Sequence, residues 1–260
     1  MRLDIYLTQN GYADSRQRAK LLISDSRVTV NGKTAVKSSM DISDSDTVEV
    51  GNDPIGYVSR GALKLKAAFE AFDLSADGKV AIDVGASTGG FTEYLLSKGA
   101  SKVYAVDSGT NQLAEKLRLD SRVVSMEKYN ARNLSAADFA EPCEIAVMDV
   151  SFISQTLIIP SLTTVMAEKS VLVSLVKPQF EAGREAVGKG GIVKSAVARA
   201  MSIRKVIGCA AENGFDFVGL IVSPIKGGDG NTEFLACFSR GGAMSGFSGN
   251  ISLLISDCVN

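Results

Sequence analysis

Four charged side chains stand at positions where a parallel-sheet enzyme carries its reacting groups. Asp149 and Lys177 each follow an apolar segment that is typical of a buried strand. Glu233 leads into a further apolar segment, and Lys64 lies on an amphipathic one. The sequence contains no histidine, which excludes Ser-His-Asp and Cys-His catalysis and leaves proton transfer to Lys, Asp, Glu, Tyr or Cys. Each charge alone is equally typical of a solvated surface, but together they predict an acid–base site if the fold brings them together.

A glycine-rich loop, Gly85–Gly90, follows one apolar strand and opens a helix. Glycine lets the backbone approach a ligand, and a helix N-terminus presents unpaired N–H groups. Asp107 ends the next apolar segment, 22 residues after Gly85, where a carboxylate can accept the hydroxyls of a ribose. The pattern predicts a binding site for either a nicotinamide dinucleotide or S-adenosylmethionine. The alternative is a tight strand-to-helix turn that binds no ligand. Ser87 replaces the middle glycine of the dinucleotide motif, which modestly favours the methyl donor because that cofactor has no pyrophosphate.

A second glycine-rich segment, Gly183–Gly190, has the spacing of a phosphate-binding P-loop but lacks the final residue of that motif. Gly190 stands where a P-loop has Ser or Thr, so the magnesium ligand is missing. The four cysteines form no Cys-x-x-Cys pair, which argues against a zinc site and a disulfide framework. We therefore expect a flexible loop near the site, no metal and no nucleotide hydrolysis.

The larger part of the chain alternates apolar strands with amphipathic helices. Strands are expected at 79–84, 102–106, 145–148, 171–176 and 218–222, and helices at 59–72, 91–98, 112–119 and 197–213. Near-continuous apolar strands separated by helices indicate an α/β domain with a parallel sheet covered on both faces. This Rossmann-like domain is predicted to span residues 59–240, and residues 241–260 form a tail without an assigned role.

Residues 1–52 have the pattern of a small α+β unit, followed by a linker at 53–58. Two short helical patterns precede a hairpin signal at Asn31-Gly32, and an alternating segment closes the unit. The N-terminus carries charges among its apolar residues, and no apolar run approaches the roughly 18 residues of a membrane span. We therefore expect a cytoplasmic protein with no membrane partner.

The balanced composition, with 28 basic and 29 acidic residues, conceals a local asymmetry. Residues 16–37 carry six basic side chains and one acid, whereas residues 41–53 carry five acids and no base. A small unit with a positive face is suited to contacting a nucleic-acid backbone, although a solvated helix face would have the same composition. The basic residues expected to contact RNA are Arg2, Arg16, Arg18, Lys20 and Lys33.

Residues 1–240 resemble one known family. Residues 1–50 are similar to the S4 RNA-binding domain at Leu3, Asp4, Gly11, Ser15, Arg16, Ala19, Leu22, Ile23, Val28 and Val30–Gly32. The remainder looks like an FtsJ-type methyltransferase at 57–61, 64–65, 85–91, 149–154, 177–181, 223–228 and 230–234. In this order the motifs resemble the TlyA (hemolysin A) family of ribosomal RNA 2′-O-methyltransferases.

The resemblance implies a Lys-Asp-Lys-Glu catalytic tetrad at Lys64, Asp149, Lys177 and Glu233. It also implies S-adenosylmethionine as cofactor and ribosomal RNA in ribosomal subunits as partner, with a cytidine ribose as methyl acceptor. The cofactor-binding residues that follow are Asp83, Gly85, Ser87, Thr88, Gly89, Gly90, Phe91, Asp107 and Asp149.

A ribose hydroxyl is a poor nucleophile until its proton is removed, whereas the methyl donor is already activated. Our hypothesis is that neutral Lys177 takes this proton, that Lys64 tunes Lys177 or holds the hydroxyl, and that the carboxylates orient both lysines. Burial and the charge of Lys64 favour the neutral amine of Lys177, whereas Asp149 and Glu233 favour its ammonium form.

Three other functions are weighed against this one. A membrane-active hemolysin would need a long amphipathic apolar face or a membrane span, and neither is visible. An RNA-binding, ribosome-associated factor without methyltransferase activity is disfavoured because all four tetrad positions hold competent residues. A small-molecule methyltransferase would leave the basic N-terminal unit unexplained.

Overall fold

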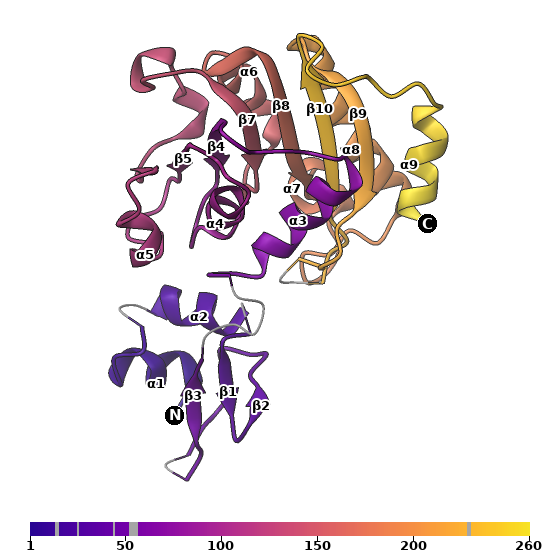
Figure 1. Cartoon of the computed structure of the whole chain (residues 1–260). Coiled ribbons are helices and arrows are strands. Elements are labelled where there is room, and N and C mark those ends of the chain that lie inside the picture. Colours follow the sequence, from indigo (N-terminus) through magenta and orange to yellow (C-terminus); the bar gives the residue numbers. More distant parts are fainter. Residues whose placement is uncertain (14–15, 25, 44, 52–56, 228–229) are drawn as a thin grey trace. The chain divides into compact units, whose positions relative to one another are not determined.

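The computed structural model describes residues 1–13, 16–24, 26–43, 45–51, 57–227 and 230–260, apart from the side chains of Gln17, Arg18 and Leu21. The predicted linker at 53–58 lies largely outside these ranges, as does Ser15 of the S4-like pattern. The chain divides into two compact units, Met1–Arg60 and Gly61–Asn260 (Figure 1).

In its described residues, the first unit is a small α+β fold of two helices and a three-stranded sheet. Its elements are α1 (Leu3–Gln9), α2 (Arg16–Ser24), β1 (Val28–Val30), β2 (Lys33–Thr34) and β3 (Val48–Val50). The sheet is antiparallel in the order β2-β1-β3. Asn31 and Gly32, with φ of +53° and +74°, occupy the two central positions of the hairpin turn. Positive φ at both positions is what a two-residue hairpin of this type requires, so the predicted turn is confirmed.

The second unit is an α/β domain built on a seven-stranded sheet. Its strands are β4 (Val80–Val84), β5 (Lys102–Val106), β6 (Val123–Met126), β7 (Cys143–Met148), β8 (Met166–Val176), β9 (Asp216–Val222) and β10 (Phe234–Arg240). Its α-helices are α3 (Gly61–Ala71), α4 (Gly90–Ser97), α5 (Glu115–Arg118), α6 (Ile159–Leu162), α7 (Pro178–Glu181), α8 (Ala196–Glu212) and α9 (Ile251–Val259). Helices α3 and α4 pack together on one face of the sheet, and α6 and α8 cover the other (Figure 1).

The strand order is β6-β5-β4-β7-β8-β10-β9, and the first five strands are parallel. The expectation of a wholly parallel sheet is wrong at the other edge, where β10 runs antiparallel to both β8 and β9. Strands β9 and β10 are joined by the short segment 223–233, whose described residues, 223–227 and 230–233, form no helix. An antiparallel neighbour needs no crossover helix, whereas a parallel one does.

The helix predicted at 112–119 shortens to the single turn α5. The backbone N–H groups of Asn111, Gln112 and Leu113 donate to the carboxylate of Glu127 at 2.7, 2.7 and 3.1 Å. These bonds fix the preceding segment, and Ala114 has a ψ of 138°, outside the helical range, so the chain becomes helical only from Glu115.

Residues 241–260, which had no assigned role, contribute α9 to the second unit. The side chain of Asn250 caps this helix by accepting hydrogen bonds from the N–H groups of Ser252 and Leu253. Ile255 and Val259 are buried in the core beside α8 and β9. Apolar burial against the rest of the domain therefore orders the end of the chain.

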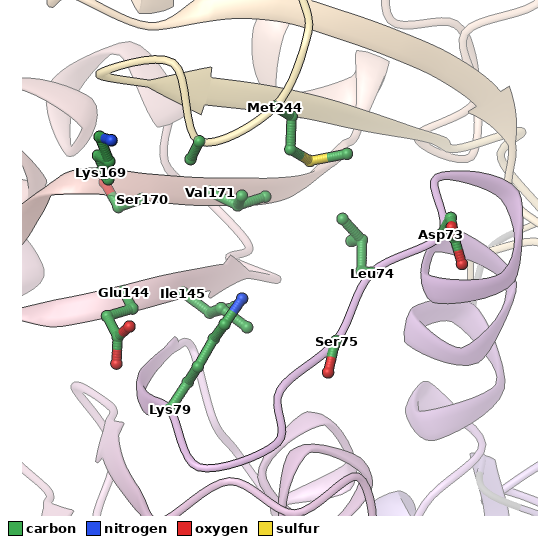
Figure 2. A pocket seen from close by; sticks show the side chains of 11 residues that line it. Asp73, Leu74, Ser75, Lys79, Glu144, Ile145, Lys169, Ser170, Val171 and Met244 are labelled. Atoms are coloured by element: carbon green, nitrogen blue, oxygen red, sulfur yellow. The ribbon is translucent and has the colours of Figure 1, made fainter.

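Cavities lined by described residues lie at opposite ends of the sheet. A cavity of about 500 Å³ lies by the segments that follow β7 and β8, at the carboxyl ends of the parallel strands. A smaller one of about 210 Å³ lies at the amino ends, beside Lys79 and Glu144 (Figure 2). The smaller cavity is lined by none of the predicted site residues. Among the described residues, no helix combines the length and apolar character needed to cross a membrane.

Candidate active site

The structure brings the four predicted acid–base residues into two ion pairs. Lys64 Nζ, from α3, lies 2.7 Å from Glu233 Oε2. Lys177 Nζ lies 2.5 Å from Asp149 Oδ1. The two lysine side chains are only 12% and 10% exposed and that of Glu233 is 2% exposed, so both pairs lie largely out of bulk water. Opposite charges this close, in a poorly solvated place, interact far more strongly than they would on an open surface.

Strand register explains why Lys177 and Glu233 become neighbours. Val176, the last residue of β8, is the antiparallel partner of Phe234, the first residue of β10. The residues just beyond this pair are Lys177 and Glu233, so each leaves its strand at the same edge of the sheet. Gln179 connects the two ion pairs, because it follows Lys177 by two residues and its Nε2 donates to Glu233 Oε1 at 3.4 Å.

Asp149 is held by the close approach of β7 to the glycine loop. Its backbone N–H donates to the carbonyl of Val84 at 2.9 Å. A Cβ atom on Gly85 would lie 2.4 Å from the carbonyl oxygen of Asp149, and Gly85 has φ of +86°. Both the space and the backbone conformation therefore require glycine at this position.

Two contacts in this site were not anticipated from the sequence. Lys177 Nζ donates to Ser151 Oγ at 2.9 Å, and Gln179 contacts Glu233 as described above. Ser151 lies in the segment after Asp149 that was recognised only as a motif, and its proximity to Asp149 was the available signal. A serine hydroxyl beside the amine gives Lys177 a second fixed partner.

The glycine loop is tied to the end of β5 through Asp107. The carboxylate of Asp107 accepts hydrogen bonds from the N–H groups of Ser87 at 2.8 Å and Gly109 at 2.7 Å. Ser87 has φ of +48°. Burial by itself raises the pKa of Glu127. The hydrogen bonds that its carboxylate accepts from the N–H groups of 111–113 outweigh burial and hold the pKa below its ordinary value. Two carboxylates thus organise the turn that follows β5.

Asp83 is the most deeply buried carboxyl group beside the loop. It is fully buried, and its Oδ2 accepts a hydrogen bond from Thr92 Oγ1 at 2.7 Å. Its Oδ1 is one of the buried side-chain atoms that have no hydrogen-bond partner among the described residues. Burial, reinforced by the charges of Asp149 and Asp107, raises the pKa of Asp83 to about 7. Asp83 is thus a carboxyl group that burial biases toward its neutral form.

An exposed aromatic side chain stands beside the ion pairs. Phe152 is 92% exposed and has φ of +65°, an uncommon backbone conformation for a bulky residue. Its ring lies 5.1 Å from the ring of Phe180. Both rings line the larger cavity, together with Gln179 and Arg184. An aromatic residue shortly after the strand-end Asp149 was the signal that the sequence offered for this surface.

The predicted RNA-contacting residues of the first unit have different surroundings. Arg2 and Arg16 both pair with the buried Asp4, at 3.0 and 2.8 Å. The hydrogen bonds from Arg2 and Arg16 hold the pKa of Asp4 well below its usual range. Lys20 and Lys33 are exposed. The side chain of Arg18 lies outside the described residues.

Comparison with known proteins identifies the family of the chain. Residues 57–240 match the model of the FtsJ-like methyltransferase family, and residues 1–48 match that of the S4 domain. The chain belongs to the FtsJ-like methyltransferase family. Within it, relatives named Hemolysin A and TlyA, 44% and 43% identical over 99% and 87% of their own length, show that this methyltransferase falls in the TlyA (hemolysin A) group, as its motifs predicted.

Two curated relatives cover most of this methyltransferase. It is 44% identical over 239 residues to "Hemolysin A" of Brachyspira hyodysenteriae, a match that covers 92% of this chain and 99% of the relative. It is 43% identical over 234 residues to the "16S/23S rRNA (cytidine-2'-O)-methyltransferase TlyA" of Mycobacterium tuberculosis, covering 90% and 87% of the two chains. The solved structure titled "Putative hemolysin from Streptococcus thermophilus" has a TM-score of 0.78 at 41% identity, and the match covers 100% of this chain and 94% of that one. These similarities extend over both units.

Proposed function

We propose that this methyltransferase transfers a methyl group from S-adenosylmethionine to the ribose 2′-hydroxyl of a cytidine in ribosomal RNA. The observation that carries the proposal is the pairing of Lys64 with Glu233 and of Lys177 with Asp149 beside the Gly85 loop. The activity named for the Mycobacterium tuberculosis relative supports the choice of acceptor. We further propose that the enzyme acts in the cytoplasm, where its ribosomal substrate is found.

The residues around the glycine loop fit the proposed cofactor. Three carboxyl groups, on Asp83, Asp107 and Asp149, stand at or beside the carboxyl ends of the neighbouring strands β4, β5 and β7. S-adenosylmethionine is a cation with a ribose, and carboxylates suit both its charge and its hydroxyls. Asp107 would hold the ribose, and the backbone of the loop Gly85–Gly90 would line the cofactor. The cofactor supplies an activated methyl group.

The chain itself has to activate the acceptor, because a ribose hydroxyl reacts slowly while it keeps its proton. Lys177 Nζ is the proposed base, and Asp149 Oδ1 at 2.5 Å would stabilise the ammonium that forms. Lys177 makes contacts typical of an ammonium group, so it must first release one proton to solvent. Lys64, held by Glu233, would donate a hydrogen bond to the acceptor oxygen.

The exposed aromatic surface suits an unpaired nucleotide. A nucleobase can stack on Phe152, which is 92% exposed, because every base has a π face. The first unit would supply phosphate contacts through Arg2, Arg16, Lys20 and Lys33, with Arg18 added from the sequence pattern. Phosphate contacts position the RNA, whereas the aromatic surface receives the nucleotide to be modified.

The direct test is methylation of unmodified ribosomal subunits with methyl-labelled S-adenosylmethionine, followed by digestion of the RNA. We expect label in 2′-O-methylcytidine and at least a hundredfold loss of it with Lys177→Arg, because the guanidinium group stays protonated. Lys79→Arg is the matched control, since Lys79 lies at the smaller cavity at the other end of the sheet (Figure 2).

Other outcomes of this experiment would overturn the proposal in distinct ways. Label on a base would refute the ribose acceptor, and full activity of Lys177→Arg would refute the proposed base. RNA binding without any methyl transfer would favour a ribosome-associated factor.

A further inference from the structure

The carboxylate of Glu181 joins the two segments that carry the proposed catalytic groups. Glu181 ends α7, the single turn that begins after Lys177, and its side chain is 1% exposed. Its Oε2 accepts a hydrogen bond from Ser154 Oγ at 2.5 Å, and its Oε1 accepts one from the backbone N–H of Gln155 at 2.7 Å. Lys205 Nζ, from α8, lies 3.3 Å from Oε2. Glu181, Ser154, Gln155 and Lys205 are termed the Glu181 clamp.

The clamp is anchored to the strand that ends at the proposed base. The side-chain nitrogen of Gln155 donates to the carbonyl of Leu175 at 2.6 Å, and its side-chain oxygen accepts a hydrogen bond from Ser174. Both partners belong to β8, close to Lys177. A buried carboxylate is costly unless its lone pairs are filled, and here Ser154, the N–H of Gln155 and Lys205 fill them. The clamp therefore holds one fixed geometry.

The clamp is suited to a role that the ion pair cannot perform. Lys177 contacts Asp149 and Ser151 directly, but those contacts must change when its amine gives up and takes up a proton. The contacts of Glu181 involve no reacting atom, so they stay the same throughout the reaction. They connect the segment 149–155, which carries Asp149 and Ser151, to α7, the turn that directly follows Lys177. A supporting contact of this kind sets the precision of a catalytic site.

We propose that Glu181 is a positioning residue that holds the segment 149–155 against α7 and so keeps Asp149 and Lys177 in register during methyl transfer. The inference rests on the proposed function, since it assigns Glu181 a part in that same reaction. Glu181 acts through these neighbours and touches neither the acceptor nor the methyl donor.

The test compares Glu181→Gln and Glu181→Ala with the wild type in single-turnover methylation of ribosomal subunits. A displacement of about 1 Å at a catalytic group can cost about a hundredfold in rate. We expect a loss of about tenfold for Glu181→Gln, whose amide nitrogen faces donors, and about a hundredfold for Glu181→Ala. The dissociation constant for S-adenosylmethionine, measured by calorimetry, should change less than twofold. Glu185→Gln, which makes the same charge change at an exposed position, should match the wild type.

A second readout does not depend on methyl transfer. Acylation of Lys177 by an amine-reactive ester, followed by peptide mass spectrometry, should be several-fold faster in the Glu181 variants because the amine is less confined. If the wild type methylates no ribose, the proposed function fails, and this labelling ratio still tests the clamp. Ser154→Ala is the milder variant if both Glu181 variants fail to fold. Unchanged methylation and labelling rates in folded variants would overturn the inference, as would a rate loss matched by an equal loss of cofactor affinity.

Discussion

Two properties of position 85 require glycine, and comparing Gly85→Ala with a matched variant separates their effects. The first property is conformational, because Gly85 has φ of +86°. The second is steric, because a Cβ atom would lie 2.4 Å from the carbonyl oxygen of Asp149. Gly214 offers a matched control, since it has φ of +81° and a Cβ atom added there would meet no neighbour within 4 Å.

The structure sets the size of the expected effect. A left-handed conformation costs an L-residue roughly 1–2 kcal/mol, and this term is common to Gly85→Ala and Gly214→Ala. The additional term at Gly85 is a displacement of about 1 Å, since ordinary contact begins near 3.4 Å and the present gap is 2.4 Å. A shift of this size at a catalytic group costs about a hundredfold in rate, or about 2.7 kcal/mol. The displaced group is the backbone of Asp149, the ion-pair partner of Lys177.

The assay is single-turnover methylation of ribosomal subunits at saturating cofactor, with urea unfolding of each variant in parallel. Gly214→Ala should lose stability but keep its rate while folded. Gly85→Ala should lose more stability, because the backbone of Asp149 must also move, and about a hundredfold in rate. Equal rates for the two folded variants would refute the argument that close packing of the loop on Asp149 sets the geometry of the site.

Three further predictions follow from single residues. Burial raises the pKa of Asp83 to about 7, so the folded protein keeps a proton that the unfolded chain has already released. The free energy of unfolding should therefore fall by about 1.4 kcal/mol per pH unit as the pH rises from about 4 to about 7. Asp83→Asn should remove this fall in urea unfolding measured across that range, and an unchanged slope would contradict it. Phe152→Ala should leave the melting temperature unchanged because the side chain is 92% exposed. The same substitution should weaken RNA binding by about 1–3 kcal/mol because a stacking contact is lost. A shift in melting temperature with intact RNA binding would argue for a structural role instead. Lys20→Ala and Lys33→Ala should each reduce the dependence of log affinity on log salt concentration by about 1, because each removes one phosphate contact, and an unaltered slope would remove that residue from the interface.

The sequence was sufficient to locate most of the site's charged residues and many of the elements that carry them. Asp149 and Lys177 follow apolar strands, and a strand end is visible in local hydrophobicity. The carboxyl ends of parallel strands meet at one edge, so their proximity follows from the fold class alone. The hairpin at Asn31-Gly32 and the helix α8 were equally predictable, because turn chemistry and a 3.6-residue period are local properties of the chain.

Tertiary structure decided how those residues pair and which neighbours support them. Lys64 meets Glu233 only because β10 runs antiparallel beside β8, and nothing local in either segment specifies that partner. Glu127 fixes the segment before α5 from outside the helix, and α9 owes its order to the core that buries Ile255 and Val259. Glu181 and the exposed Glu185 are both glutamates, yet Glu181 is buried among three hydrogen-bond donors from two other segments. Periodicity and motifs report on contacts between residues near in sequence, whereas pairing, burial and hydrogen-bond partners depend on segments that only the folded chain brings together.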